Sequence, residues 1–559
     1  MPPLLRRRVA ARTHSGDTHV IRGLGLHESY QLAIQTLDQY RGTVVACRYG
    51  LPAGLARPEN TESLKAKFYD AVVSVALAQP HMQTGVWGEN SKKPILLRLD
   101  RFELRNHVEW VMLEGSRDPE AQYLEILQST LDAKFTDISS RPGWRAVVLQ
   151  HAGADCIDVI YVWSHTHHDG MSGKIFHEQL LRNLNSKVNP DRKFIRNDHE
   201  EPEKWIVYLP DFRDKFPPPP KDLCAFPTSV PYLVKNVFKE LKPPAIFPPN
   251  NTFALWAPIK STPFKTTFRT FTIGHELVAK IVAACREHHT TVTALLHVLV
   301  LLSLTKGLKD AKGFASRTPY NLRPILPSRP EKYPWLEPKD TMCNDVSIVD
   351  HLFDAKLVAS IRAKLAGTAK PKGGVLGALE VEAEMPTRPL SADLLEIVWS
   401  TSARVRREIK ARLDAGDKND MIGIMKFAPE WKAHMKNEAK KPRPLSWLVT
   451  NVGVVDGREN GKAPADGVVQ TQSAEAQGPG EGGHHPQQGG DDQEWSIRRA
   501  ELLLSADVAS AALQISVMTV KDEQMAVTCS WQDCVVDAGL GRCFVDDLER
   551  WLKEIGSSG

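Results

Sequence analysis

A buried strand that leads directly into a histidine-rich turn constrains the fold of this chain more than any other stretch. Residues 157–163 form an unbroken apolar run, which predicts a strand covered on both faces. Residues 174–185 then place apolar side chains at helical spacing, with Ser172 as the expected N-cap. Between them lie three histidines, an aspartate and a glycine: His165, His167, His168, Asp169 and Gly170. Because such turns present side chains from a rigid scaffold, this turn is the candidate reactive site.

Two chemistries fit these residues. In the first, His165 is a general base, because an imidazole with an ordinary pKa of about 6.5 is largely neutral at cellular pH and can accept a hydroxyl proton. Asp169 then braces the turn, and Gly170 permits a backbone angle that other residues resist. In the second, His165, His167 and Asp169 begin a signature similar to that of metallo-β-lactamase-fold hydrolases. A further histidine would follow the aspartate there, and Gly170 stands in its place.

Length and composition limit the class of protein. The 559 residues are 42% hydrophobic and 25% charged, which predicts a globular protein of two domains. A net charge of +4 is far from the strongly basic balance of nucleic-acid-binding proteins, so we expect no nucleic-acid partner. The eight cysteines include no CxxC pair and predict reduced thiols in a cytoplasmic protein. The longest apolar run, residues 292–304, is interrupted by His297 and is too short for a transmembrane segment.

The order of expected elements predicts a mixed fold. In the first part, strands are expected at 43–49, 94–99, 108–113, 145–150 and 157–163, and helices near 30–40, 64–77, 120–131 and 174–185. In the second part, strands are expected at 266–273, 445–457, 496–504, 513–520 and 525–531, and helices at 275–288, 290–304, 393–414 and 545–555. No internal repeat is visible, so the pattern predicts an α/β (α+β) protein rather than a solenoid.

Composition shifts divide the chain. A basic tail, residues 1–22, precedes a first half at 23–205 that carries the histidine turn. A proline-rich crossing segment at 206–263 leads to a second half at 264–559. Within that half, residues 457–492 are rich in Gly, Gln, Ala and Pro. This insert buries too little apolar surface to offset its ordering entropy, so we predict that it is disordered.

The final expected helix, residues 545–555, is amphipathic and leaves two interpretations open. It docks on the second domain, or it lies on a membrane surface. The second interpretation would allow a cytoplasmic monomer to associate weakly with the endoplasmic reticulum or with lipid droplets.

Five short motifs follow one another in a family-like order. They are Gly23–Glu28 (GLGLHE), His165–Gly173 (HTHHDGMSG), Thr318–Pro324 (TPYNLRP), Thr450–Val454 (TNVGV) and Cys529–Asp537 (CSWQDCVVD). Together they resemble the motifs of the fungal alcohol O-acetyltransferase family. That family belongs to the chloramphenicol acetyltransferase-like group, with plant BAHD acyltransferases and peptide-synthetase condensation domains. The DFGWG motif of the plant branch is absent from this sequence.

The resemblance implies two chloramphenicol acetyltransferase-like domains, each a mixed sheet flanked by helices, with a channel between them. Acetyl-CoA as cosubstrate and a small alcohol would meet there at His165, which acts as the general base without a metal or a bound cofactor. Asp169 would hold the turn through an ion pair with Arg323. Thr450 and Asn451 would line the pocket, donate to the oxyanion or serve the structure alone.

Three other functions stay open beside acyl transfer from acetyl-CoA to an alcohol or secondary metabolite. One is a metal-dependent hydrolase that uses His165, His167 and Asp169. Another is acyl transfer from a carrier protein. The third is a catalytically silent relative of the same fold.

Overall fold

The first half is built on a five-stranded sheet, and the strand that leads into the histidine turn is its central strand. The computed structural model describes residues 19–151, 153–186, 205–241, 254–367, 390–428, 430–458 and 494–558. The strand order is β14-β2-β8-β7-β6. The strands are β2 (Gly42–Gly50), β6 (Val108–Met112), β7 (Trp144–Gln150), β8 (Cys156–Ser164) and β14 (Ser496–Leu504). β8 is central and antiparallel to both β2 and β7, which explains its unbroken apolar run.

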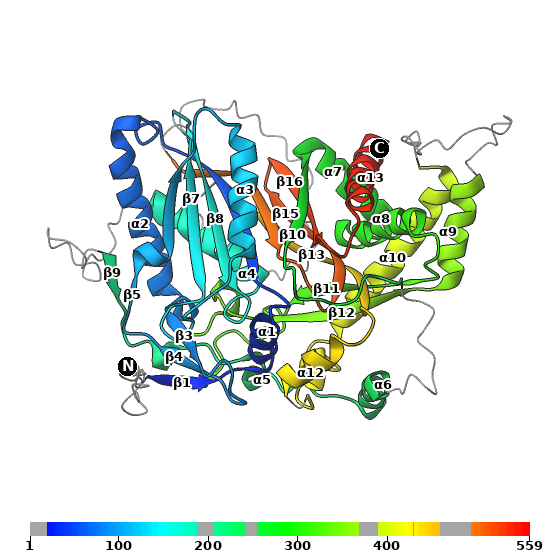
Figure 1. Cartoon of the computed structure of the whole chain (residues 1–559), viewed down its shortest axis with the longest axis horizontal. Helices are drawn as coiled ribbons and strands as arrows, with labels where there is room; N and C mark the ends of the chain where they lie inside the picture. The colour runs from blue at the N-terminus through cyan, green and yellow to red at the C-terminus, as the bar shows by residue number, and fades with distance from the viewer. Residues whose placement is uncertain are drawn as a thin grey trace, which may run out of the picture.

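Helices cover both faces of this sheet (Figure 1). α2 (Thr61–Ala78) and α4 (Gly170–Asn185) pack on one face, and α3 (Pro119–Asp132) packs on the other. Alternate residues of β8 therefore enter two separate apolar clusters, with Tyr161 on the α4 side and Val162 on the α3 side. The histidine turn leaves the sheet between these two layers.

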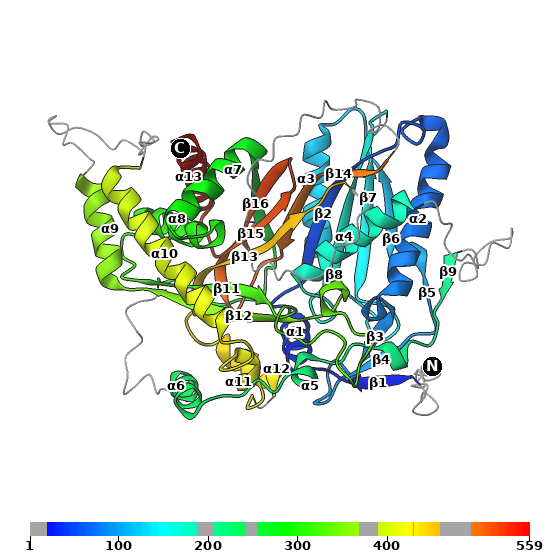
Figure 2. The same ribbon diagram turned by 180° about the vertical axis from the view of Figure 1, so that it is seen from behind.

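The second half is a six-stranded sheet in the order β10-β16-β15-β13-β11-β12. The strands are β10 (Thr266–Gly274), β11 (Phe314–Asn321), β12 (Val346–Phe353), β13 (Leu445–Val455), β15 (Ala511–Val520) and β16 (Gln524–Gln532). The main helices are α7 (His275–Glu287), α8 (Val292–Gly307), α9 (Ala355–Gly367), α10 (Ala392–Asp414) and α13 (Ala538–Ser557). The two mixed sheets with their helices confirm the predicted fold class (Figures 1 and 2).

The apolar helix α8 is enclosed as its composition requires. Leu295, Leu299 and Leu302 are fully buried in the core of the second half. The closing helix α13 packs against α7 and α8, and its Leu548 and Trp551 lie in the same core. The amphipathic face of α13 is therefore occupied by its own domain.

Strand β14 departs from the division of the chain made on sequence. Residues 496–504 follow the second half in sequence, but β14 pairs antiparallel with β2 of the first sheet, from Ser496 opposite Gly50 to Leu504 opposite Thr43. The apolar composition of a short strand such as β14 is compatible with either sheet. Its pairing register with β2 places it in the first sheet. The C-terminal part of the sequence thus supplies one strand of the first sheet.

Smaller elements surround the two main sheets (Figure 2). β1 (Val20–Gly23), β4 (Ile95–Arg98) and β3 (Thr84–Trp87) form a three-stranded sheet, and β5 (Arg101–Glu103) pairs with β9 (Ile206–Tyr208). The helices in this region are α1 (Leu26–Thr36), α5 (Pro220–Leu223), α6 (Val230–Leu241), α11 (Met421–Met425) and α12 (Trp431–Glu438). The crossing segment thus contains the helices α5 and α6.

Within the described ranges, no single helix is both long and apolar enough to cross a bilayer. The pair α7 and α8 satisfies that test only jointly, with a bend of 90° between the two helices.

The insert can be removed without stretching the chain. Most of the basic tail and of the insert lies outside the described residues, but the flanks of the insert are joined, because Ile497 N donates to Gly457 O at 2.8 Å. Deleting residues 460–491 and bridging them with a short Gly/Ser linker should leave the melting temperature and turnover almost unchanged, since loop-closure cost varies only logarithmically with length. Thermal unfolding and acyl-transfer assays check this, and loss of soluble protein would contradict it.

Candidate active site

The histidine turn is anchored by a helix cap that differs from the predicted one. Asp169, not Ser172, is the N-cap of α4, and its carboxylate accepts a hydrogen bond from Ser172 N at 2.9 Å. The Ser172 hydroxyl lies in the first turn and also donates to Asp169 Oδ1 at 2.9 Å. An aspartate caps the exposed N–H groups of a helix start as well as a serine does, so the choice between them depends on where the turn ends.

The carboxylate of Asp169 forms a buried ion pair with Arg323, the partner that the resemblance implied. Arg323 Nη1 donates to Asp169 Oδ2 at 2.6 Å and Nη2 donates to Oδ1 at 3.1 Å. The two side chains are only 2% and 3% exposed. Burial alone would raise the pKa of Asp169, but the charge and hydrogen bonds of Arg323 hold it below its ordinary value. Asp169 is therefore ionised at neutral pH and bonded to Arg323.

His165 is the one histidine of the turn that is partly exposed. Burial lowers the pKa of its imidazole below the ordinary 6.5, against an opposing effect from a hydrogen bond to its own carbonyl and from Asp169. The rings of His27 and Tyr40 contact it, with centroids 6.3 and 5.9 Å away. The imidazole is thus neutral near pH 7, as a general base requires.

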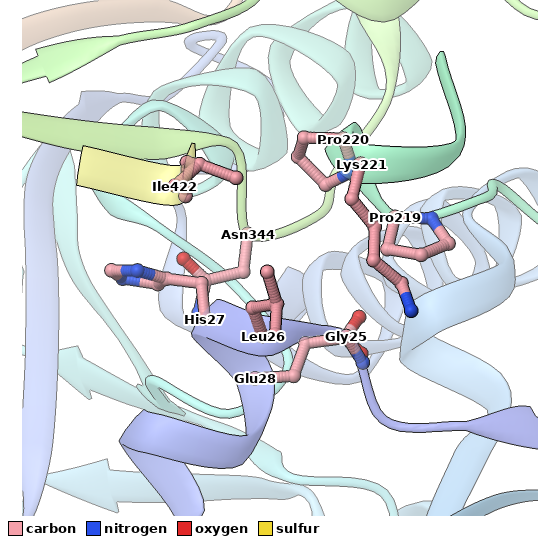
Figure 3. A pocket seen from close by; sticks show the side chains of 9 residues that line it. All are labelled: Gly25, Leu26, His27, Glu28, Pro219, Pro220, Lys221, Asn344 and Ile422. Carbon is pink, nitrogen blue, oxygen red and sulfur yellow. The ribbon is translucent and has the colours of Figure 1, made fainter. Parts of the chain in front are cut away.

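A small pocket opens next to this histidine, between residues of both halves (Figure 3). His27 and Asn344 supply polar groups to its wall, and Figure 3 shows both side chains extending to the same side. The other lining residues come from the start of α1, from the crossing segment and from α11: Gly25, Leu26, Glu28, Pro219, Pro220, Lys221 and Ile422. The pocket volume of about 10 Å³ is that of a single water molecule, so the pocket is a narrow gap beside the turn rather than a full substrate site.

Gly170 lies close to a strand of the second half and does not have the predicted backbone angle. It is the first residue of α4 and is absent from the glycines with positive φ in the described chain. A Cβ at this position would lie 3.1 Å from Val452 Cγ1 of β13, which is tighter than an ordinary contact. The glycine therefore lets the strand of the second half approach the start of α4.

Thr450 and Asn451 lie on β13, close in sequence to that contact. Thr450 is half-buried and pairs with Ser516 of β15. The Asn451 side chain donates to Thr293 Oγ1 at 3.2 Å and accepts from Gly453 N at 2.8 Å. These bonds support a structural role for Asn451 at the bend of the strand, where Gly453 has a φ of +80°.

The other two histidines of the turn point into the protein. His167 is 1% exposed, it packs against Gly143 with no room for a Cβ there, and burial followed by the nearby His81 lowers its pKa to about 4. His168 is buried, with its ring near the hydroxyl of Tyr161. In the described residues, no group of three His, Cys, Asp or Glu side chains could hold a metal ion. The ligands of the metallohydrolase alternative are therefore not brought together here.

Sequence reasoning missed the segment that completes the site from the second half. Asn344 Nδ2 donates to the carbonyl oxygen of His165, and Asp345 N donates to Asp169 Oδ2 at 2.9 Å. Cys343 O accepts from Asp169 N at 3.1 Å. Residues 343–345 lie in a loop without helical or strand periodicity, so no pattern in the sequence marks them.

Comparisons with known proteins agree on one family. Residues 121–335 match the alcohol acetyltransferase family. The chain is 27% identical to the probable alcohol acetyltransferase FCK4 of Fusarium pseudograminearum, over 98% of this chain and 97% of that protein. It is 23% identical to the probable alcohol acetyltransferase crmB of Aspergillus fumigatus, over 81% of this chain and 82% of that protein.

Solved structures with the same fold are more distant in sequence. The trichothecene 15-O-acetyltransferase TRI3 of Fusarium sporotrichioides superposes with a TM-score of 0.60 at 12% identity, covering 96% of this chain and 94% of that one. The condensation domain of the monacolin K polyketide synthase MokA gives 0.56 at 10% identity, covering 96% and 97%. This likeness concerns the fold alone. The family match over residues 121–335 and the two fungal relatives show that the chain is similar to alcohol acetyltransferases, and they support an acyltransferase enzyme.

Proposed function

We propose that the enzyme moves an acetyl group from acetyl-CoA to a hydroxyl group of a small molecule, with His165 as the general base. The observation that carries this proposal is the neutral, partly exposed imidazole of His165, on a turn fixed by a buried ion pair, whose neighbours His27 and Asn344 line a small pocket. A base needs a pKa near or below the working pH and access to the proton it takes. His165 has both, and His167 and His168 have no such access.

The reaction needs one proton to move twice. The neutral imidazole takes the proton of the alcohol as its oxygen attacks the thioester carbonyl carbon. The tetrahedral intermediate collapses with loss of the CoA thiolate, and the imidazolium returns the proton to that sulfur. No acyl-enzyme forms, so no nucleophilic serine or cysteine is required. Asp169 contributes by holding the turn, because its carboxylate is fully engaged by Arg323 and the main chain.

A direct assay tests the donor and the acceptor together. Purified enzyme with isotopically labelled acetyl-CoA and a panel of primary, secondary and polycyclic alcohols should yield labelled esters detected by mass spectrometry. A parallel arm supplies the acetyl group on a phosphopantetheinylated carrier protein. If ester formed only with the loaded carrier protein, the carrier protein and not CoA would be the acetyl donor. If no ester formed with either donor, the proposal would be contradicted.

His167→Ala separates acyl transfer from metal chemistry. A metal site that uses His165, His167 and Asp169 would lose activity with either histidine. In acyl transfer His167 is a buried packing residue, so we expect the folded variant to keep turnover within about tenfold and to melt earlier, because a cavity is left. We also expect wild-type activity to survive exhaustive dialysis against a chelator. Activity lost on chelation and restored by zinc would contradict this.

A further inference from the structure

Several polar groups near His165 are already hydrogen-bonded within the protein. The amide of Asn451 donates to a hydroxyl of α8 at 3.2 Å, and Asn344 Nδ2 donates to the main-chain carbonyl of His165. The hydroxyl of Tyr40, whose ring contacts His165, is bonded to Thr43 Oγ1 at 2.8 Å. The negative charge that forms on the thioester carbonyl oxygen needs a donor that is not engaged in this way.

His27 is a second, partly exposed imidazole beside the turn. It lies in the first turn of α1, and its ring centroid is 6.3 Å from that of His165. It also lines the narrow gap shown in Figure 3. Its Nε2 lies 3.3 Å from the amide nitrogen of Gln31, and within the described residues its Nδ1 has no hydrogen-bond partner. Since an amide nitrogen is a donor, Nε2 accepts that bond and the proton of the neutral ring is on Nδ1.

The electrostatic environment of His27 suits a donor and not a base. Burial, followed by the neighbouring His165, lowers the pKa of His27 to about 3. A group with so low a pKa is too weak a base to take the proton of a hydroxyl. A neutral imidazole of lowered pKa instead polarises a carbonyl by hydrogen bonding and keeps its own proton. The two histidines are thus fitted for different tasks.

A buried ion pair holds the helix start that carries this second imidazole. Arg22 donates to both carboxylate oxygens of Glu28, at 2.7 and 2.8 Å, and Gly25 N donates to the same carboxylate at 2.5 Å. The Glu28 side chain is only 7% exposed. This arrangement matches the pair of Asp169 and Arg323 at the start of α4. The GLGLHE motif therefore fixes its histidine in the way that the second motif fixes the base.

We propose that His27 is a catalytic residue that donates a hydrogen bond from Nδ1 to the thioester carbonyl oxygen as that oxygen becomes negative. This inference rests on the proposed function of His165 as the base. The alcohol proton moves to His165 while the alcohol oxygen bonds to the carbonyl carbon and an electron pair moves onto the carbonyl oxygen. When the carbon–sulfur bond breaks, that pair restores the carbonyl and the thiolate receives the proton from His165. His27 keeps its proton throughout.

Two substitutions at His27 give opposite results for a donor and for a packing residue. His27→Phe keeps a ring next to Tyr30 but removes the N–H. It should lower kcat by about 10²–10³-fold, the range for loss of one oxyanion donor. KM for both substrates should change less than about threefold, because the charge exists only in the transition state. His27→Asn loses the ring but keeps an N–H near the place of Nδ1, and should retain kcat within about tenfold. A packing role predicts the reverse order.

Matched variants in the same assay separate this inference from the proposed function. His288→Phe is the control, because this partly exposed ring stacks on Trp399 at 4.2 Å in the second half, and it should leave kcat unchanged. His27→Leu repeats the loss of the donor with a smaller side chain, and thermal unfolding shows which variants are folded. Turnover retained in His165→Ala would contradict the proposed base. If His165→Ala is inactive but folded His27→Phe or His27→Leu stays within about fivefold of the wild type, this inference alone is overturned. A loss in His27→Asn as large as in His27→Phe would also overturn it.

Discussion

His165→Ala should leave a folded enzyme whose turnover is lower by at least about 10²–10⁴-fold, the range for loss of a general base. The side chain is partly exposed and bonds other groups mainly through its main-chain carbonyl, so truncation costs little stability. Steady-state kinetics with acetyl-CoA, together with thermal unfolding, measure both effects. Turnover near that of the wild type in a well-folded variant would remove His165 from the mechanism.

The pH dependence of kcat/KM in the wild type is a second test of His165 as the general base. His165 is a base only when neutral, and burial holds its pKa below 6.5. Lowering the pH through that pKa protonates the imidazole, so kcat/KM should be level near pH 7 and should fall only as the pH drops through a value below 6.5. An acidic limb centred above pH 7 would mean that a charged neighbour stabilises the imidazolium, against the arrangement described here.

Asp169→Ala should destabilise the fold by about 3–5 kcal/mol and also reduce turnover, because it leaves the guanidinium of Arg323 buried without its partner. Both side chains are almost fully buried, so solvent screening does not diminish this effect. The double variant with Arg323→Met should recover part of the stability, since the orphaned charge is removed, but not the turnover. Chemical denaturation and kinetics of the three variants give the two effects separately.

A second ion pair of the same sheet supplies the control. Asp158 on β8 pairs with Arg48 on β2 at 2.8 Å, and it lies seven residues before His165, toward the other end of the strand. Asp158→Ala should lower stability, less than Asp169→Ala because Arg48 is 28% exposed, and should leave turnover unchanged. If Asp169→Ala lost activity without loss of stability, Asp169 would be a direct participant in the chemistry.

The stability contributed by Asp169 has a definite pH window. The pKa of this carboxyl is lower in the folded than in the unfolded chain, where it is about 3.9. Its contribution is therefore complete above that unfolded pKa and is lost as pH falls below about 4 through the folded pKa.

Much of this arrangement follows from patterns in the sequence. Residues 157–163 had to be a central strand because both faces carry large apolar side chains, and β8 is that strand. The pairing of Asp169 with Arg323 followed from two motifs that keep their order in a family, although the residues lie 154 positions apart. Local periodicity and motif order thus place the turn and its brace.

What the sequence could not supply depends on contacts between distant segments. Asn344 reaches His165 from a loop with no periodic pattern, across a separation of 179 residues. The need for glycine at position 170 arises from Val452 of another strand, so the residue alone suggested a backbone angle instead of a lack of space. The exchange of β14 between the halves depends on register, which apolar composition leaves undetermined.

The position of β14 has a consequence for how the protein is made. Roughly 330 residues separate the end of β8 from the start of β14, so at about 5–20 residues per second the ribosome adds the missing edge strand some 15–65 s later. During that time β2 presents an unpaired apolar edge, which is a template for pairing with other chains. Nascent chains of this enzyme are therefore exposed to aggregation for most of their synthesis, and a first half translated alone keeps that open edge permanently.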